Sequence, residues 1–256
     1  MENKKKVLFF LWSFSLGGGA EKILSTIVSN LDLEKYQIDI LEIEHFDKGY
    51  EAVPEGVRIL KPYKKKSYGR VIDSILWRLR IYFPHLVRKW LIKDDYDIEV
   101  SFTIMNPAFP FSKREGVKKI AWIHGSIEAF LAENQAHYRK NHFEQLSHAD
   151  KIIAISKKTR ESIEIVYPMF SDKIQTIYNG YDFTSLLEKS EEVAPVTLEN
   201  HSICVIGRLE ELKGTDRVLE VFTKLQQELS DIHLYYIGSG EQESFLKGEV
   251  ERLQLQ

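Results

Sequence analysis

The sequence has little cysteine and no long apolar run, and each absence excludes a class of protein. One cysteine, Cys204, in 256 residues excludes an internal disulfide framework and a cysteine-rich zinc site. No uninterrupted apolar stretch approaches the roughly 18 residues that a membrane-spanning helix needs. A formal net charge of −3 lacks the positive excess that is typical of a nucleic-acid binder. With 43% apolar and 29% charged residues, the chain has the composition of a globular protein with a sizeable core.

The first residues imitate a secretory signal, because the lysines at 4–6 precede an apolar segment at 7–12. Ser13 and Ser15 interrupt the apolar character, however, and the single cysteine gives no support for export. The same residues fit a buried parallel strand that leads into a glycine turn and a helix. We therefore expect a cytoplasmic protein.

Short apolar runs alternate with helical patterns along the whole chain, which predicts an α/β protein. Strands are expected at about 6–12, 37–43, 57–60, 97–102, 118–123, 151–155, 174–178, 202–206 and 232–237, and helices at about 19–31, 70–82, 136–147, 157–166, 214–229 and 241–253. Cys204 falls inside an expected strand, where we predict a buried small hydrophobe.

A polar, weakly periodic stretch divides this pattern. We expect an N-terminal domain at 1–182, a linker at 183–200 and a C-terminal domain at 201–256. The C-terminal part holds two strands and two helices, whereas a doubly wound domain normally continues through several more such units. It therefore corresponds to the first part of such a domain.

Three consecutive glycines, Gly17, Gly18 and Gly19, follow the first expected strand and open a helix. Glycines there let backbone amides approach an anionic or sugar ligand, although a tight turn without a ligand explains them equally well. The segment lacks the dinucleotide fingerprint and the P-loop ending, which disfavours a nicotinamide-dependent enzyme. His124 ends another expected strand and precedes a glycine, so it is either a ligand-side residue or a structural histidine. The other histidines show no metal-ligand spacing, and no metal site is expected.

Two basic residues follow a later strand. Arg208 comes directly after Gly207, and Lys213 follows five residues later, before the next helix. Together they could hold a pyrophosphate whose leaving group gains charge during bond cleavage, and the alternative is that both are solvated surface charges. A second strand-to-glycine turn at Gly238 is consistent with backbone that closely approaches a ligand.

Residues 61–93 carry ten basic side chains and one acidic one, a formal charge of +9 that leaves −12 on the rest of the chain. An apolar helical stripe and three aromatic residues accompany the charge. Such a basic amphipathic segment suits an anionic membrane surface, and a core-packed helix with a solvated basic face is the equally weighted alternative. The residues predicted to face a membrane are Lys64, Lys65, Lys66, Arg70, Trp77, Arg78 and Arg80.

Six motifs stand in the order in which they occur in one enzyme family. They are Gly17-Gly18-Gly19-Ala20-Glu21, Ile123-His124-Gly125, Ala149-Asp150 through Ser156, Ile177-Tyr178-Asn179-Gly180-Tyr181-Asp182, Gly207-Arg208-Leu209 with Lys213-Gly214, and Gly238-Ser239-Gly240. In this set the chain resembles retaining glycosyltransferase family 4 over nearly its whole length.

The resemblance implies a GT-B fold, with a Rossmann-like N-terminal domain on the acceptor side and the first part of a second Rossmann-like domain that binds the donor. It implies transfer of a sugar, with retention, from a nucleotide-diphosphate donor to a glycan or lipid-linked acceptor in cell-surface polysaccharide synthesis, without a metal or another cofactor. His124 would be the catalytic residue beside the transferred sugar. Donor-binding residues would be Gly18, Arg208, Lys213 and Gly238, and the acceptor-side loop would hold Gly17, Gly19 and Glu21.

One family motif, Glu-x7-Glu, is not matched in its expected context, and we expect the isolated chain to bind donor poorly and turn over slowly. Several pairs of glutamates have this spacing by chance, so no catalytic glutamate is assigned. The alternative function is a non-catalytic acceptor- or membrane-binding subunit that requires a protein partner. In either case we expect no nucleic-acid partner, and peripheral binding to the inner face of the cell membrane would follow from the basic segment.

Overall fold

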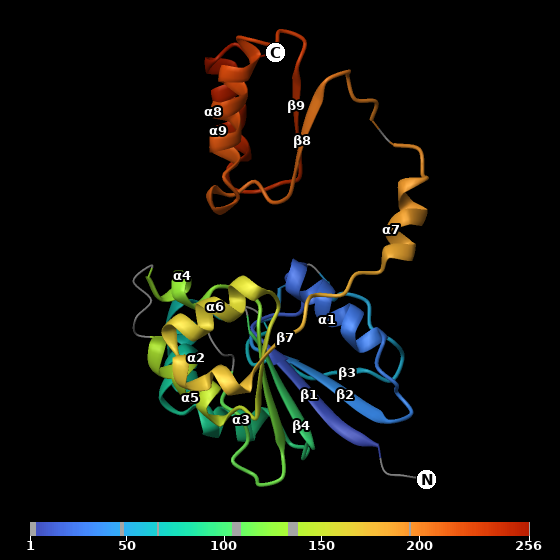
Figure 1. The fold of residues 1–256 in the computed structure, drawn as a ribbon. Coiled ribbons are helices and arrows are strands. Elements are labelled where there is room, and N and C mark those ends of the chain that lie inside the picture. The colour runs from blue at the N-terminus through green and yellow to red at the C-terminus, as the bar shows by residue number, and fades with distance from the viewer. Residues whose placement is uncertain are drawn as a thin grey trace. The chain divides into compact units, whose positions relative to one another are not determined.

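The computed structural model describes residues 4–46, 49–65, 67–103, 109–132, 138–194 and 196–255. The contacts within the chain divide it into two units, Met1–Thr184 and Ser185–Gln256 (Figure 1). Every strand pair in both units is parallel, and helices separate most successive strands. The α/β class predicted from the alternating apolar runs is therefore confirmed.

Unit 1 is built on a seven-stranded sheet with the strand order β3-β2-β1-β4-β5-β6-β7. Its strands are β1 (Lys5–Leu11), β2 (Tyr36–Glu42), β3 (Arg58–Ile59), β4 (Ile98–Thr103), β5 (Lys118–Ile123), β6 (Lys151–Ala154) and β7 (Ile174–Thr176). Val7 on β1 pairs with Ile38 on one side and Ile98 on the other. The strand order reverses next to β1, and ligands of doubly wound sheets bind at such a point.

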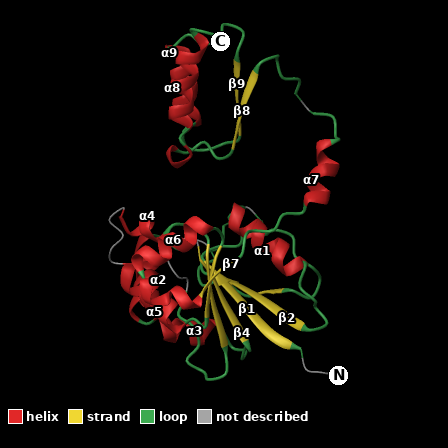
Figure 2. Ribbon diagram, viewed as in Figure 1, coloured by secondary structure: helices red, strands yellow, loops and turns green. Residues whose placement is uncertain are grey.

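Helices cover both faces of this sheet (Figure 2). α1 (Gly19–Ser29) packs Ile23, Leu24 and Val28 against one face. The other face contacts helices that include α3 (Pro84–Leu91), α4 (Ile127–Ala132), α5 (Arg139–His148) and α6 (Lys157–Val166), and α2 (Arg70–Tyr82) packs there through Leu76. Both faces are thus shielded from water, which explains why the strands are continuous apolar runs.

Buried acidic residues interrupt these apolar strands, and each is paired. Arg58 donates to Asp39 over 2.9 Å, and the hydroxyl of Tyr96 donates to the same carboxylate. On β4, Glu99 accepts from the guanidinium of Arg88, which α3 contributes. A buried carboxylate is tolerated only with such partners, so these pairs fix α3 and β3 on the sheet.

The observed elements follow the predicted ones closely, but the sequence patterns missed three of the described α-helices. α3 begins at Pro84, which fits because proline is well accommodated in the first turn of a helix. α4 has only six residues, which is too short for a clear periodicity. α7 (Phe183–Ser190) lies in the segment predicted as a linker, and none of its residues is buried.

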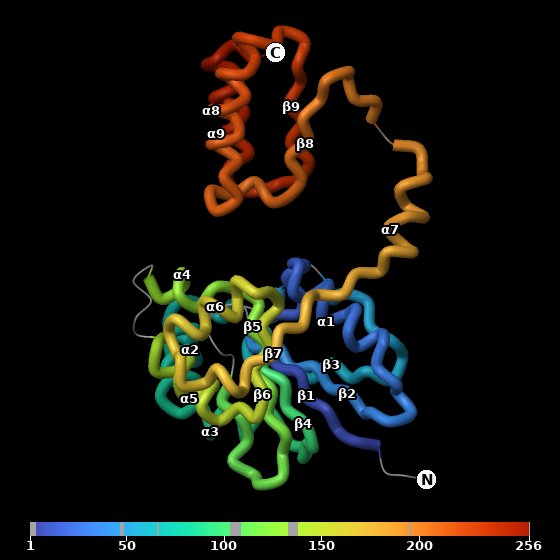
Figure 3. Tube along the Cα trace, in the orientation of Figure 1, coloured from blue at the N-terminus to red at the C-terminus, as the bar shows by residue number. Residues whose placement is uncertain are grey.

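Unit 2 contains the parallel pair β8 (Ser202–Ile206) and β9 (His233–Ile237), the short 3-10 helix η3 (Glu211–Lys213), and the helices α8 (Thr215–Gln226) and α9 (Glu243–Arg252). The trace in Figure 3 shows both helices on the same side of the two strands. Leu209, Leu219 and Leu246 form the buried core between helices and strands.

The predicted burial of Cys204 is wrong. Cys204 is exposed, and on the same face of the pair Ile206 is 79% exposed and Ile237 is 47% exposed. The helices of unit 2 cover the opposite face, which carries Leu234 and Tyr236. The apolar run therefore predicted a strand correctly, but it did not predict that one face of the strand is uncovered by the described residues of this unit.

Candidate functional site

The carboxyl ends of the unit 1 strands carry the predicted glycine segment and His124 at one edge of the sheet. β1 leads into the loop that ends at Gly18, and β5 leads into His124. β4 lies between them, and its Phe102 contacts Phe9 of β1 and the ring of His124, with centroid distances of 6.5 and 4.0 Å. This edge is where an α/β sheet normally binds its ligand.

The three glycines form the turn from β1 into α1. Gly17 has a positive φ of 77°, and Gly18 is the N-cap in an extended conformation. Gly17 and Gly19 are exposed, and a Cβ atom added to either would meet nothing within 4 Å. A Cβ on Gly18, by contrast, would lie 2.6 Å from Oε2 of Glu21. The turn thus leaves backbone amides open at the positive end of α1.

Glu21 belongs to the predicted acceptor-side loop, but its side chain does not extend toward solvent. It lies in the first turn of α1 and is buried, with its carboxylate directed back to Gly18. A carboxylate in this turn also interacts favourably with the helix dipole. Its position suits a residue that shapes the glycine turn.

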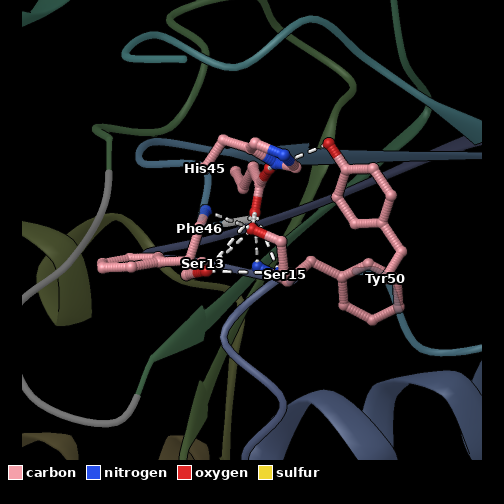
Figure 4. A network of polar contacts seen from close by, with 7 residues as sticks. Ser13, Ser15, His45, Phe46 and Tyr50 are labelled. Atoms are coloured by element: carbon pink, nitrogen blue, oxygen red, sulfur yellow. Dashed lines mark hydrogen bonds and ion pairs between the residues drawn. The ribbon is translucent and has the colours of Figure 1, made fainter. Parts of the chain in front are cut away.

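Ser13, Ser15, His45, Phe46 and Tyr50 belong to a polar network (Figure 4). Its centre is the buried carboxylate of Glu42, at the end of β2. Its Oε2 atom accepts from the backbone N–H groups of Phe14 and Ser15, at 2.7 and 3.1 Å, and from the hydroxyl of Ser15 at 2.9 Å. The hydroxyl of Ser13 lies 3.4 Å from the same oxygen. The residues directly before the glycine turn are therefore held by one charged acceptor.

The other carboxylate oxygen of Glu42 holds the loop after β2. His45 Nδ1 and the hydroxyl of Tyr50 lie 2.8 and 2.9 Å from Oε1. Burial and this hydrogen bond raise the pKa of Tyr50 above its usual range. The N–H of Phe46 also donates to Ser15 Oγ over 2.7 Å. The network thus joins two loops at the carboxyl edge.

Glu42 was not among the site residues predicted from the sequence. The available signal was an acidic residue at the end of an apolar strand, because a carboxylate in that position must find donors. Which donors it finds depends on loops that are distant in sequence.

His124 is packed between aromatic rings. Its ring is stacked at 15° on Trp122 with the centroids 6.3 Å apart, and burial lowers its pKa to about 4. The Nε2 atom is buried and has no hydrogen-bond partner among the described residues. The imidazole is therefore neutral at physiological pH and suited to hydrogen bonding instead of ion pairing.

In unit 2, the two glycine turns after β8 and β9 are in direct contact. The N–H of Leu209 donates to Ser239 O over 3.0 Å, and a Cβ atom on Gly238 would lie only 1.8 Å from Gly207 O. Only glycine therefore fits at position 238. The contact brings the carboxyl ends of both strands together.

Arg208 and Lys213 are both exposed beside these turns. The guanidinium of Arg208 lies 2.9 Å from Glu210 Oε1, and its side chain keeps 66% exposure. Lys213 ends η3 and has no ion pair with a described residue. Gly214 follows with a φ of 67°, and α8 begins there. Both cations are thus available to an anion at the edge of β8 and β9.

The basic segment forms an apolar and basic surface on α2 and α3, here called the α2–α3 surface. Its exposed side chains are Val71, Ile72, Ile75, Trp77, Leu79, Ile81, Tyr82, Phe83, Leu86, Trp90, Arg70, Arg78 and Lys89. Most of the predicted apolar stripe is therefore on the surface, and Leu76 is its member that packs against the core.

Two of the residues predicted to face a membrane have other positions. The prediction for Arg80 is wrong, because the side chain is 8% exposed, its Cζ atom lies 5.1 Å from the Trp12 ring centroid, and burial lowers its pKa. Lys64 pairs with Glu44 and Asp73, at 2.6 and 3.4 Å, so its charge is compensated within the protein. Lys65 is exposed, and Lys66 lies outside the described residues.

Neither a metal cluster nor a membrane-spanning helix is found in the part of the chain that the structure describes. No three side chains of histidine, cysteine, aspartate or glutamate gather as a metal site there. No helix there is both long enough and apolar enough to cross a bilayer.

Sequence comparison divides the chain almost where its contacts do. Residues 17–185 match the sequence model of Glycosyltransferase Family 4, and residues 188–256 match that of Glycosyl transferases group 1. An uncharacterized glycosyltransferase of Haemophilus influenzae is 26% identical over 259 residues, which covers 98% of this chain and 67% of that protein.

The fold is similar to two solved structures at low sequence identity. HepE from Anabaena, in complex with UDP and glucose, has a TM-score of 0.58 and 15% identity over 97% of this chain and 67% of its own. The catalytic domain of starch synthase IV from Arabidopsis thaliana, bound to ADP and acarbose, has a TM-score of 0.61 and 12% identity over 98% of this chain and 72% of its own. The expected GT-B fold class is confirmed. The chain spans about two-thirds of the length of HepE and of the Haemophilus protein.

Replacing Glu42 with glutamine should loosen the loop before the glycines. The substitution keeps the shape but removes the negative charge, so the buried N–H groups of Phe14 and Ser15 lose a charge-assisted acceptor at a cost of about 1–3 kcal/mol. We expect amide hydrogen exchange at Phe14 and Ser15 to become at least about tenfold faster. Glu34→Gln, at an exposed position, is the matched control. Unchanged protection at both amides would contradict the role given to Glu42.

The lowered pKa of His124 predicts acid sensitivity of unit 1. Between its usual pKa of 6.5 and about 4, the unfolded chain binds a proton that the folded chain does not. Stability should therefore fall as the pH drops through this window, by up to about 3 kcal/mol. All four tryptophans lie in unit 1, so urea unfolding at pH 7 and pH 5 can be followed by their fluorescence. His124→Phe should reduce the difference in the free energy of unfolding between pH 7 and pH 5. An equal difference in both proteins would refute the prediction.

Proposed function

Because the chain belongs to Glycosyltransferase Family 4, we propose that it transfers a sugar, with retention at the anomeric carbon, from a nucleotide-diphosphate donor to a glycan or lipid-linked acceptor. We further propose that this transfer serves the synthesis of a cell-surface polysaccharide. A non-catalytic subunit, the alternative considered from the sequence, is not favoured by the family match.

The observation that carries the proposal is the pair of interlocked glycine turns in unit 2, with Arg208 and Lys213 exposed beside them. In the reaction, the bond between the sugar and the diphosphate breaks and the leaving group gains negative charge. Two fixed cations next to open backbone stabilise that charge, and in this proposal they act where other enzymes use a metal ion. Gly238 keeps the backbone close enough for the diphosphate to contact both turns.

Unit 1 supplies the acceptor side in this proposal. The exposed amides at Gly17 and Gly19 bind the acceptor, and Gly18 lies near the donor phosphates. Glu42 acts indirectly, since it holds the residues before that turn. His124 provides a neutral hydrogen-bonding group toward the transferred sugar, because an imidazole with a pKa of about 4 carries no charge at pH 7.

The solved relatives support a nucleoside diphosphate as the donor's leaving group, because HepE was solved with UDP and glucose and starch synthase IV with ADP. They differ in base, so both nucleotides serve as probes. Binding is a sharper readout than turnover here, because it tests Arg208 and Lys213 directly.

Isothermal titration with UDP and ADP should show that Arg208→Ala and Lys213→Ala each weaken binding of the preferred nucleotide at least about tenfold. Loss of one charge-assisted hydrogen bond accounts for about 1.5–3 kcal/mol. Lys224→Ala removes an exposed cation from α8 in the same unit and should leave the affinity unchanged. Equal affinities in all four proteins would exclude the proposed diphosphate clamp.

We also propose that the protein binds peripherally to the inner face of the cell membrane through the α2–α3 surface. Exposed tryptophan, tyrosine and leucine side chains beside arginine and lysine are the composition of an interfacial helix. Each basic residue near an anionic bilayer contributes about 1 kcal/mol. The exposed cations that contribute are Arg70, Arg78 and Lys89.

Cosedimentation with phosphatidylglycerol vesicles tests this surface. The double variant Arg70→Glu/Arg78→Glu should lower the partition coefficient of the protein at least about tenfold. Vesicles of phosphatidylcholine alone should bind the unchanged protein weakly. Lys157→Glu/Lys158→Glu makes the same charge change at exposed positions on α6 and should have a smaller effect. Equal losses in both double variants would indicate that net charge, and not this surface, governs binding.

A further inference from the structure

Unit 1 contains a cavity of about 490 Å³ that the proposed transfer reaction does not use. It lies between the junction of α2 and α3, the segment at 109–113, the start of β5 and one side of α5. Its volume falls within the range of small-molecule sites. Lys119 in its wall lies near the start of β5, five residues before His124. At the rise of an extended strand, the two residues are about 16 Å apart.

The wall of this cavity has an excess of positive charge. Lys113 and Lys119 line it, and Glu144 is the acidic residue in the same wall. Arg80 also borders the cavity, but its guanidinium lies beside Trp12. Lys113 and Lys119 form no ion pair with any described residue. The pKa of His85, also in the wall, is lowered by burial and by the positive charge of Lys113. The charges of Lys113, Lys119 and Glu144 thus sum to +1.

The cavity also contains a hydrogen-bond donor without an acceptor. Gln145 on α5 lines the wall, is 5% exposed, and its Nε2 atom has no hydrogen-bond partner among the described residues. A buried amide without a partner costs about 1–3 kcal/mol. The Nε2 atom lies beneath the cavity surface, so a shift of this side chain toward an acceptor brought by a ligand would recover that energy. Asn141, one helical turn away, presents a second amide to the same space.

We propose that this cavity binds an organic phosphate. A phosphate group is attracted by this positive excess and accepts hydrogen bonds from lysine and amide donors. The cavity is larger than a phosphate ion, and Ile81, Pro84 and Phe111 give part of its wall an apolar character that suits an organic moiety. The phosphate comes either from a lipid headgroup at the α2–α3 surface, which shares Ile81 with the wall, or from a soluble phosphate ester.

Titration of the full chain with two probes separates these sources. Glycerol 3-phosphate represents a soluble ester, and dihexanoyl phosphatidic acid below its micelle concentration represents a lipid headgroup. Saturable binding of both probes indicates a soluble ester, and binding of the lipid alone indicates a headgroup. Saturable binding of neither probe overturns the proposal.

Adjacent residues of β5 provide a matched pair of variants. Lys119→Ala should weaken probe binding at least tenfold, and Lys118→Ala, at an exposed position outside the wall, should not change it. Gln145→Leu keeps the size of the side chain and should also weaken probe binding. With two variants, a folding defect in one of them does not decide the test. Equal effects of Lys119→Ala and Lys118→Ala overturn the site. Because these readouts concern unit 1 alone, failure here leaves the nucleotide titrations of Arg208 and Lys213 unaffected.

Discussion

Burying a carboxylate is costly unless donors surround it, and Glu42 meets this requirement by drawing two loops together. The loop after β1 supplies backbone and hydroxyl donors, and the loop after β2 supplies His45 and Tyr50. These hydrogen bonds fix the residues at 13–15, which lie directly before the glycine turn. The glycines that follow have no side chains that would cover their backbone amides. The open amides at the start of α1 therefore depend on the carboxylate of Glu42, which is itself buried.

The same requirement explains what could and could not be predicted from the sequence. The strands of unit 1 were predictable because a parallel sheet covered on both faces needs continuous apolar runs. All of the expected strands, those of unit 2 included, are present. The glycine turns and His124 were predictable as strand-end features. The partners of Asp39, Glu42 and Glu99 were not, because Arg58, Tyr96 and Arg88 reach them from other elements. Local patterns contain no information on such distant pairs.

The basic segment shows a second limit of patterns. Its ten cations look alike in sequence, yet the fold gives them different roles. Arg88 neutralises a buried glutamate, Lys64 pairs with two acids, and Arg80 is enclosed beside Trp12, whereas Arg70 and Arg78 are exposed. Helical periodicity places the apolar stripe on one face, but it does not say whether that face meets a core or water. The exposed stripe on α2 is the case in which it meets water.

The contact between the two glycine turns of unit 2 also has a genetic consequence. Every missense change in a glycine codon introduces a side chain with a Cβ atom, and at position 238 that atom would overlap the carbonyl oxygen of Gly207. The codon therefore has no conservative neighbour, since alanine, serine and valine are as poorly accommodated as arginine. Gly19 has no such steric constraint, because a Cβ atom there would meet nothing within 4 Å. Gly17 has the same free space, but its φ of 77° still favours glycine. In a library of random point mutations, position 238 should tolerate only synonymous changes, whereas Gly19 should accept small residues.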